Sequence, residues 1–200
     1  MTGAEAPLRS FVAVALPDAV RASIAEAAGA LARELPGVRW SRKPENLHVT
    51  MKFLGPVEPA RLDVLGAALG DALAGVPRFG FTVRGWGAFP SARDAKVIFA
   101  GLSTLDDARG LAQLNEVAEV VDAVAARFGF PREARRFTGH VTVGRSKEGV
   151  DARAALARDA DRAFGTVEVS EVHVYESRLS TASGEGSTYV LRGRAALGAN

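Results

Sequence analysis

Two copies of one tripeptide constrain this chain more than any other feature of its sequence. His48-Val49-Thr50 lies in the first half and His140-Val141-Thr142 in the second, and together they hold two of only three histidines. Each triplet lies in a short, mostly apolar stretch that is typical of a β-strand. Side chains alternate between the two faces of a strand, so each His and the Thr two residues later point the same way. The chain therefore carries two matched strand faces, each with an imidazole and a hydroxyl.

Apolar patterning predicts the same order of elements around both triplets. In each half a strand, a helix, the triplet strand, another helix and another strand follow one another. In the first half these are residues 9–16, 18–35, 47–54, 59–74 and 79–85; in the second they are 96–102, 104–128, 139–144, 151–163 and 166–175. Two further strands are predicted over 38–41 and 187–197, and a loop over 87–91. Because His48 and His140 are 92 residues apart, we infer an internal duplication.

The length and composition fit a globular domain with a core of its own. The chain has 200 residues, of which 48% are hydrophobic, and a net charge of only +2. It has no cysteine, which excludes disulfides, thiol nucleophiles and thiolate metal sites. No apolar run approaches the roughly 20 residues of a membrane span, and no leader is evident, so we expect a cytoplasmic protein. We predict one α+β domain over residues 1–200, built as two intimate, pseudo-symmetric lobes of about 1–100 and 101–200.

Two histidines on matched strands suit acid–base chemistry at phosphorus. Imidazole has an unperturbed pKa of roughly 6.5, so one ring can act as a base while the other, protonated, acts as an acid. The base takes a proton from an attacking water, and the acid protonates the departing oxygen. The hydroxyls of Thr50 and Thr142 can donate to the non-bridging phosphate oxygens. A 2′,3′-cyclic phosphate fits best, because its strained ring already holds the leaving oxygen.

No set of metal ligands accompanies the triplets, so we expect chemistry without a cofactor. Neither triplet has a third His or a cluster of Asp and Glu beside it, as a metal site requires. A zinc site that uses both imidazoles is the alternative. It predicts that chelators abolish activity, whereas acid–base catalysis predicts chelator resistance and a bell-shaped dependence of rate on pH.

Both triplets extend to a His-x-Thr-x motif with an apolar residue at each x, namely His48 to Met51 and His140 to Val143. Their flanks also carry information, in residues 11–17, Trp40, 45–55, 87–90, 96–102, 175–177 and 189–191. In all these stretches the chain resembles the 2H phosphoesterases, in particular the bacterial LigT-like RNA 2′,3′-cyclic phosphodiesterases first called 2′-5′ RNA ligases. The resemblance spans nearly the whole chain.

This resemblance implies a bilobal fold with the active-site cleft between two antiparallel sheets. It implies hydrolysis of a 2′,3′-cyclic phosphate, on an RNA end or a nucleotide, to a 2′-phosphate, without metal or nucleotide cofactor. It also implies that His48 is the proton donor and His140 the proton acceptor. The family usually has Pro before the second His, where this chain has Gly139, which relaxes the backbone. We expect a tolerated variation, and a monomeric enzyme.

Three further residues are candidate contacts for the substrate. Lys52 lies on the same predicted strand face as the first His and Thr, so it can contact an anion, with a solvated strand end as the alternative. Trp40 can stack on a base or pack in the core. Arg145 is placed by simple alternation on the face opposite the second His, unless the strand ends or bulges at Gly144.

Other residues have a structural interpretation beside the functional one. His173 lies among alternating valines, which predicts a surface or cleft-rim position rather than a third catalytic group. Phe11 and Phe89 are candidates for stacking on a base, with core packing as the alternative. A basic cluster before the second triplet can guide RNA phosphates or form a solvated loop; its members are Arg132, Arg135 and Arg136.

Three functions compete at this stage. Hydrolysis of RNA 2′,3′-cyclic phosphates is the leading hypothesis. Joining of 2′–5′ RNA ends uses the same two imidazoles in the reverse direction. An RNA- or nucleotide-binding module that has lost turnover is the third hypothesis, and the presence of both His and both Thr argues against it.

Overall fold

The structure is a computed structural model that describes residues 6–104, 109–179 and 186–198. Its strands are β1 (Leu8–Ala15), β2 (Arg39–Trp40), β3 (His48–Val57), β4 (Phe79–Ser91), β5 (Asp94–Ser103), β6 (Val141–Arg145), β7 (Ala163–Val169), β8 (Glu171–Arg178) and β9 (Thr188–Ala196). Its helices are α1 (Asp18–Glu34), α2 (Pro59–Leu73), α3 (Arg109–Arg127) and α4 (Arg153–Arg158), with a 3₁₀ turn η1 (Pro44–Asn46). The predicted α+β class is confirmed.

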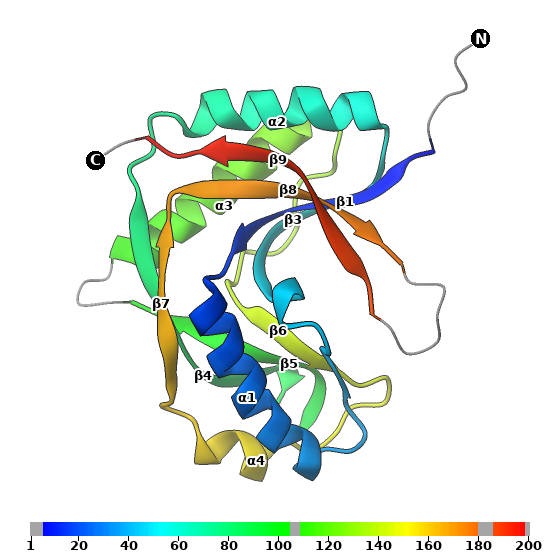
Figure 1. Cartoon of the computed structure of the whole chain (residues 1–200), viewed down its shortest axis with the longest axis vertical. Coiled ribbons are helices and arrows are strands. Elements are labelled where there is room, and N and C mark those ends of the chain that lie inside the picture. Colours follow the sequence, from blue (N-terminus) through cyan, green and yellow to red (C-terminus); the bar gives the residue numbers. More distant parts are fainter. Residues whose placement is uncertain (1–5, 105–108, 180–185, 199–200) are drawn as a thin grey trace.

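The described strands form one curved antiparallel sheet with the two triplet strands in its middle. The strand order is β7-β4-β5-β6-β3-β1-β8-β9, and β2 pairs with β6. Helices α2 and α3 lie together over the half that contains β3 and β9, whereas α1 and α4 lie near β7 and β4 at the other end (Figure 1). The two predicted antiparallel sheets are therefore the two halves of one continuous sheet, joined where β3 meets β6.

The helices form where apolar residues recur every three or four positions, because such residues share one helix face. Helix α2 buries the predicted leucine stripe, made of Leu62, Leu65, Leu69 and Leu73. It begins at Pro59, whose missing N–H costs nothing in the first helical turn. Each helix thus presents one apolar face to the sheet and contributes it to a shared core. Within the described residues, no helix is both long and apolar enough to cross a membrane.

The strand pairing does not follow the predicted boundary of the lobes near residue 100. β4, the last strand of the first predicted repeat, pairs with β5 and β7 of the second repeat. In the same way β8, from the second half, pairs with β1 of the first. Each repeat therefore gives its last strand to the other lobe. Apolar patterning predicts that a strand is buried but not which strand becomes its neighbour, so the duplication is visible in the sequence and this exchange is not.

Three element boundaries also differ from the prediction. Residues 87–91, expected to be a loop, belong to β4, because a left-handed Gly85 (φ 67°) lets the strand shift its register and continue against β5. The strand predicted over 166–175 is two strands, β7 and β8, which turn at Ser170 and lie at opposite parts of the sheet. Helix α4 is shorter than the predicted 151–163.

β3 and β6 each contain a bulge directly after the triplet. The residues of β1 pair with Thr50 and then with Lys52, so one residue of β3 is skipped. The residues of β5 pair with Thr142 and then with Gly144, so one residue of β6 is skipped as well. A skipped residue reverses the alternation of side chains beyond it. Residues after each bulge therefore face the side opposite to the one that simple alternation predicts.

The exchanged strands predict that neither half of the chain folds alone. A fragment of residues 1–104 holds β1 and β3 without β8, and β4 without β7, so it leaves edges of apolar strands unpaired. We expect no cooperative thermal transition for this fragment by circular dichroism, and recovery of a transition when a fragment of residues 105–200 is added. A sharp transition for residues 1–104 alone would contradict the exchange.

Candidate active site

The two triplets meet at the centre of the sheet. Val49 pairs with Val141 in the antiparallel direction, and both valines are fully buried. The His and Thr of each triplet therefore face the side opposite the valines. Because β3 and β6 run in opposite directions, the His end of each triplet lies beside the Thr end of the other. The two imidazoles and two hydroxyls share one face of the sheet.

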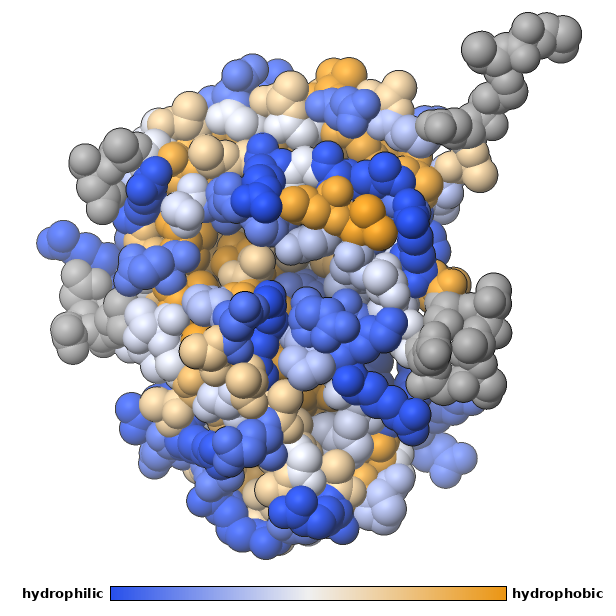
Figure 2. All heavy atoms as spheres, in the orientation of Figure 1, coloured by the Kyte–Doolittle hydropathy of each residue, from blue (hydrophilic) through white to orange (hydrophobic). Residues whose placement is uncertain are grey.

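A cleft of about 820 Å³ opens on this face. Five of the predicted site residues line it, namely His48, Thr50, Thr142, Trp40 and Arg145. His140 is not among the lining residues; its ring contacts the rings of Phe89 and Phe99, at centroid distances of 5.1 and 5.2 Å. Hydrophilic residues gather at the centre and right of the face shown in Figure 2, beside the ends of β8 and β9.

Backbone and aromatic contacts fix the ring of His48. Its Nδ1 donates to the carbonyl oxygen of Asn46 at 2.7 Å, because a carbonyl can only accept. Its Nε2 is then the acceptor, 2.9 Å from the hydroxyl oxygen of Thr50, which donates to it. Phe11 stacks on the ring at 4.8 Å and Tyr189 meets it edge-on at 5.3 Å. His48 thus presents Nε2 toward its own Thr.

His140 has the same tautomer, since its Nδ1 donates to the carbonyl oxygen of Thr138 at 2.7 Å. The preceding Gly139 lies in a crowded place, where a Cβ would be 2.8 Å from Leu102 Cδ1 and 3.0 Å from Leu114 Cδ2. Its φ is not positive, so packing rather than backbone freedom calls for glycine here. In both triplets, therefore, the carbonyl two residues before the His orients the ring so that Nε2 is the free base.

Comparison of the chain with known proteins identifies its family. A model described as "LigT like Phosphoesterase" matches residues 14–99 and 105–183, and each matched segment contains one triplet. The chain belongs to the LigT-like phosphoesterase family. The resemblance seen in the sequence is thereby confirmed.

Relatives of this LigT-like phosphoesterase share one name. The chain is 30% identical over 178 residues to a Methanothermobacter thermautotrophicus protein named RNA 2′,3′-cyclic phosphodiesterase, and the match covers 88% of this chain and 92% of that one. It is 28% identical over 173 residues to a Thermotoga maritima protein of the same name, covering 86% and 88%. Among solved structures, E. coli LigT in its apo form gives a TM-score of 0.71 at 26% identity, covering 97% of this chain and 99% of that one.

Burial keeps both imidazoles of this LigT-like phosphoesterase neutral at pH 7. Loss of solvent lowers the pKa of His48 to about 4, and repulsion from His140 adds to this effect, against the opposing bond to Asn46. Loss of solvent also lowers the pKa of His140, and the nearby Arg145 lowers it further. The influence of His140 on His48 shows that the two rings are electrostatically coupled. An anion bound between them favours protonation, so it raises both pKa values.

The bulge in β6 brings Arg145 to the cleft. Simple alternation places this residue opposite the second His, but the register shift at Gly144 turns it to the same side. Its guanidinium makes no ion pair within the described residues. A bulge, one of the two alternatives that the sequence leaves open, therefore places Arg145 in the cleft.

The bulge in β3 has the reverse effect on Lys52, and the expected anion contact is wrong. Lys52 is 3% exposed and points away from the cleft. Its Nζ lies 2.8 Å from Asp122 Oδ1 of α3 and 3.1 Å from Glu133 Oε1, and it donates to the carbonyl oxygen of Pro131 at 2.7 Å. Residues 131–140 contain no helix or strand. Lys52 therefore anchors the irregular segment that leads into His140.

The predicted surface or cleft-rim position of His173 is wrong, because this residue is only 8% exposed. Its Nδ1 is 2.7 Å from the hydroxyl of Tyr175 and its Nε2 is 2.6 Å from Glu171 Oε1. Tyr175 in turn stacks on Phe11 at 5.4 Å, the residue that stacks on His48. His173 thus belongs to a row of side chains behind the first imidazole, which explains its burial without a catalytic role.

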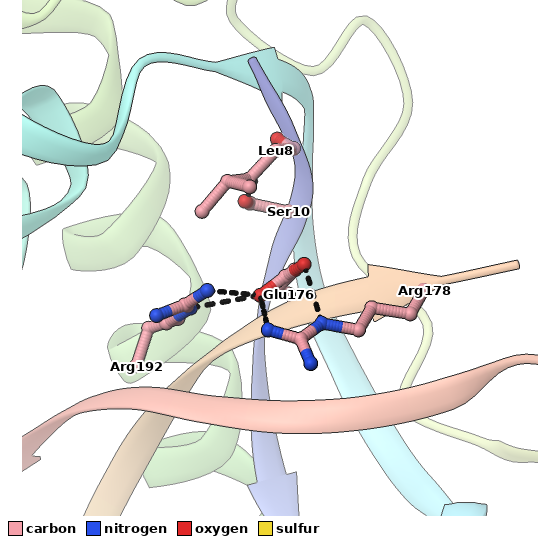
Figure 3. A network of polar contacts seen from close by, with 5 residues as sticks. All are labelled: Leu8, Ser10, Glu176, Arg178 and Arg192. Atoms are coloured by element: carbon pink, nitrogen blue, oxygen red, sulfur yellow. Dashed lines mark hydrogen bonds and ion pairs between the residues drawn. The ribbon is translucent and has the colours of Figure 1, made fainter. Parts of the chain in front are cut away.

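The ends of β8 and β9 form one wall of the cleft through Ser177 and Tyr189. Behind this wall Glu176, 6% exposed, lies between two guanidinium groups (Figure 3). Arg178 Nε donates to it at 2.8 Å and Arg192 Nε at 2.9 Å. The two arginines hold the pKa of Glu176 below its usual range. This charged clamp joins the two strands next to the cleft.

Sequence reasoning missed several residues that line the cleft. Phe53 comes after the β3 bulge, so alternation assigned it to the wrong face; it lies in the cleft and is 65% exposed. Tyr189 contacts His48 from β9. The predicted basic cluster contributes no lining residue, since Arg132 pairs with Asp122 at 2.9 Å. The basic residues of the cleft are instead Arg9, Arg39, Arg42, Lys43 and Arg145. No sequence signal locates a bulge, and these arginines resemble any others of the chain.

In the described part of the chain, no three His, Asp or Glu side chains form a group that could hold a metal ion. In the zinc alternative, the two imidazoles would bind the metal ion. Catalysis without a metal stays a prediction.

Replacing Lys52 tests its anchoring role. Lys52→Met leaves the buried Asp122 with one cationic partner and frees the segment before His140, so we expect a loss of unfolding free energy on the order of 3 kcal/mol. Lys96→Met is the matched control, because Lys96 is 53% exposed and only 3.9 Å from Asp94. Urea unfolding measures both variants. Equal stability of the two variants would contradict the anchor.

The low pKa of His48 has a consequence for stability. The folded protein keeps this ring neutral down to about pH 4, whereas the unfolded chain protonates it near 6.5. The unfolded state therefore binds more protons as pH falls from 6.5 to 4, which costs roughly 3 kcal/mol of stability over that window. We expect His48→Gln to lose less stability than the wild type between these pH values in urea unfolding. The same loss in both proteins would show that His48 is protonated in the folded state.

Proposed function

We propose that this protein hydrolyses RNA 2′,3′-cyclic phosphate ends to 2′-phosphates, with His48 and His140 as the acid–base pair. The observation that carries the proposal is the meeting of both triplets across the Val49–Val141 pair, on the same face of the sheet, beside a basic cleft. The names of the relatives support the choice of substrate. E. coli LigT, whose structures include complexes with 3′-AMP and with phosphate, has the same fold as this chain.

In the proposed reaction, the oxygen of a water molecule attacks phosphorus opposite the 3′ oxygen. The water proton passes to Nε2 of His140 as the new P–O bond forms. The bond between phosphorus and the 3′ oxygen breaks, and Nε2–H of His48 donates a proton to that oxygen. The phosphate stays on the 2′ oxygen, and each proton transfer is worth about 10²–10⁴ in rate. The assignment of acid and base follows the family resemblance.

The surroundings of the two rings support these roles. Both imidazoles have Nε2 as the available nitrogen, because Nδ1 of each donates to a backbone carbonyl. A neutral His140 is ready to accept a proton. A neutral His48 must gain one before it can act as an acid, and the negative charge of a bound phosphate favours that step. Thr50, Thr142 and Arg145 line the cleft, which supports a role for them in contacting the charged oxygens.

Every residue that we assign to the site lies in one chain. We therefore propose that the enzyme acts as a monomer, and, with RNA as its substrate, in the cytoplasm. Joining of 2′–5′ RNA ends uses the same two imidazoles in the reverse direction, and its product distinguishes it from hydrolysis. A binding module without turnover is distinguished by binding without product.

Removing either imidazole tests the proposal. We expect His48→Ala and His140→Ala each to lower the rate of hydrolysis of a nucleoside 2′,3′-cyclic phosphate by about 10²-fold or more. Phosphorus NMR of the reaction reports turnover and whether the product is the 2′- or the 3′-phosphate. Thermal unfolding of each variant checks that the fold is retained. Unchanged turnover in either variant contradicts the acid–base pair.

A second experiment tests the cofactor. The wild-type reaction is repeated with EDTA after dialysis, and across pH 5 to 9. Acid–base catalysis by two histidines predicts full activity with EDTA and a bell-shaped profile. Loss of activity with EDTA, restored by zinc, would favour the metal alternative.

A further inference from the structure

The cleft carries more positive charge than one phosphate needs. Arg9, Arg39, Arg42, Lys43 and Arg145 line it, and among the described residues that line it there is no Asp or Glu. Within the described residues, none of these five cations forms an ion pair with a carboxylate. By contrast, nine arginines elsewhere in the described residues have such a partner, for example Arg178 with Glu176. Cations kept without protein anions indicate an anionic ligand.

Four of these five cations, all except Arg9 of β1, lie along β6, β2 and the segment that follows β2. Arg145 stands at the second triplet, and Arg39 is its neighbour across the β2–β6 pair. Arg42 and Lys43 follow in the segment that leads from β2 to η1. At ~3.3 Å per residue, an extended segment from 39 to 43 spans ~13 Å. One phosphate at the two imidazoles cannot contact both ends of such a row, but successive phosphates of a strand can.

The segment that bears these cations is tied to the opposite wall. Lys43 Nζ donates to the hydroxyl oxygen of Thr188 at 2.9 Å, and the side-chain amide of Asn46 donates to the carbonyl oxygen of Ser187 at 2.5 Å. Both acceptors lie at the start of β9. The row of charges is therefore held in place before any ligand arrives, which lowers the entropy lost on binding.

An exposed aromatic ring completes the pattern. Phe53 leaves 65% of its surface exposed in the cleft and touches only the tilted ring of Phe11 among the aromatics, at 6.2 Å. Leu179, 62% exposed, lines the same cleft. Cations that follow a backbone, together with aromatic rings on which bases stack, are how proteins bind single-stranded nucleic acid. The volume of about 820 Å³ lies near the upper end for small-molecule sites.

We propose that this site is built for an RNA strand rather than a mononucleotide: Arg39, Arg42 and Lys43 bind phosphates upstream of the cyclic phosphate, and Phe53 stacks on a base. This inference rests on the proposed function and adds the length and path of its substrate. The upstream nucleotides then raise affinity through contacts that a cyclic mononucleotide cannot make.

Kinetics on substrates of increasing length test the inference. The probes are adenosine 2′,3′-cyclic phosphate and adenylate dimers and tetramers that end in the same group. For the wild type we expect kcat/KM to be at least tenfold higher for the tetramer, through a lower KM, and the advantage to shrink as salt is raised. We expect Arg42→Gln and Phe53→Ala each to reduce the ratio of tetramer to monomer kcat/KM at least threefold. Arg42→Lys retains the charge and should retain most of the ratio.

Arg135→Gln is the matched control. This substitution removes the same charge as Arg42→Gln, from an exposed residue that does not line the cleft. It should leave the ratio within twofold of the wild type. Equal kcat/KM for monomer and tetramer in the wild type, or the same ratio in Arg42→Gln and Arg135→Gln, would overturn the inference while leaving the proposed function intact.

A binding arm separates the two proposals if no cyclic phosphate is hydrolysed. A fluorescein-labelled tetramer ending in a 2′-phosphate is titrated with protein and followed by anisotropy. In Arg42→Gln we expect weaker binding and a slope of log Kd against log salt that is lower by about 0.7, the loss of one phosphate contact. Absence of turnover with this binding pattern refutes the hydrolase alone. Binding that is the same in Arg42→Gln and the wild type refutes the upstream site.

Discussion

The antiparallel pair between Val49 and Val141 is the contact on which the rest of the site depends. It is where the two halves of the sheet join, and its two buried side chains fix which way their neighbours point. A shift of one residue in the register of either strand would turn that strand's imidazole into the core. The burial of two paired valines thereby positions four polar side chains on the opposite face.

The same pair holds both imidazoles in a place where their protonated forms are disfavoured. It buries both imidazoles in part, and this loss of solvent, together with repulsion from His140, lowers the pKa of His48 to about 4. Backbone carbonyls orient both rings and oppose part of this effect. A site with two neutral bases and a row of unpaired cations is electrostatically prepared for an anion. Binding of a phosphate relieves the penalty on protonation, so the charge needed for acid catalysis is supplied by the substrate.

Matched bulges give the pseudo-symmetric site an asymmetric surface. The third residue after each Thr reaches the cleft because of the bulge, and it is Phe53 in one strand and Arg145 in the other. The second residue after Thr50 is Lys52, which is buried and points away from the cleft. One lobe thus offers a ring and the other a guanidinium to a common ligand. Lys52 meanwhile links β3 to the segment that leads into His140, so the first triplet strand helps to place the second.

By itself the sequence determined the repeat, the helices, the α+β class, the family and the side on which His48, Thr50, His140 and Thr142 lie, because these depend on local periodicity and on short motifs. Only the tertiary structure decided which strands are neighbours, so that β4 and β8 change lobes. It also decided where alternation breaks, which removed Lys52 from the cleft and brought in Phe53 and Arg145. The reason is that strand partners and bulges arise from contacts between residues far apart in the chain, whereas the pattern along a strand is the same whichever neighbour it takes.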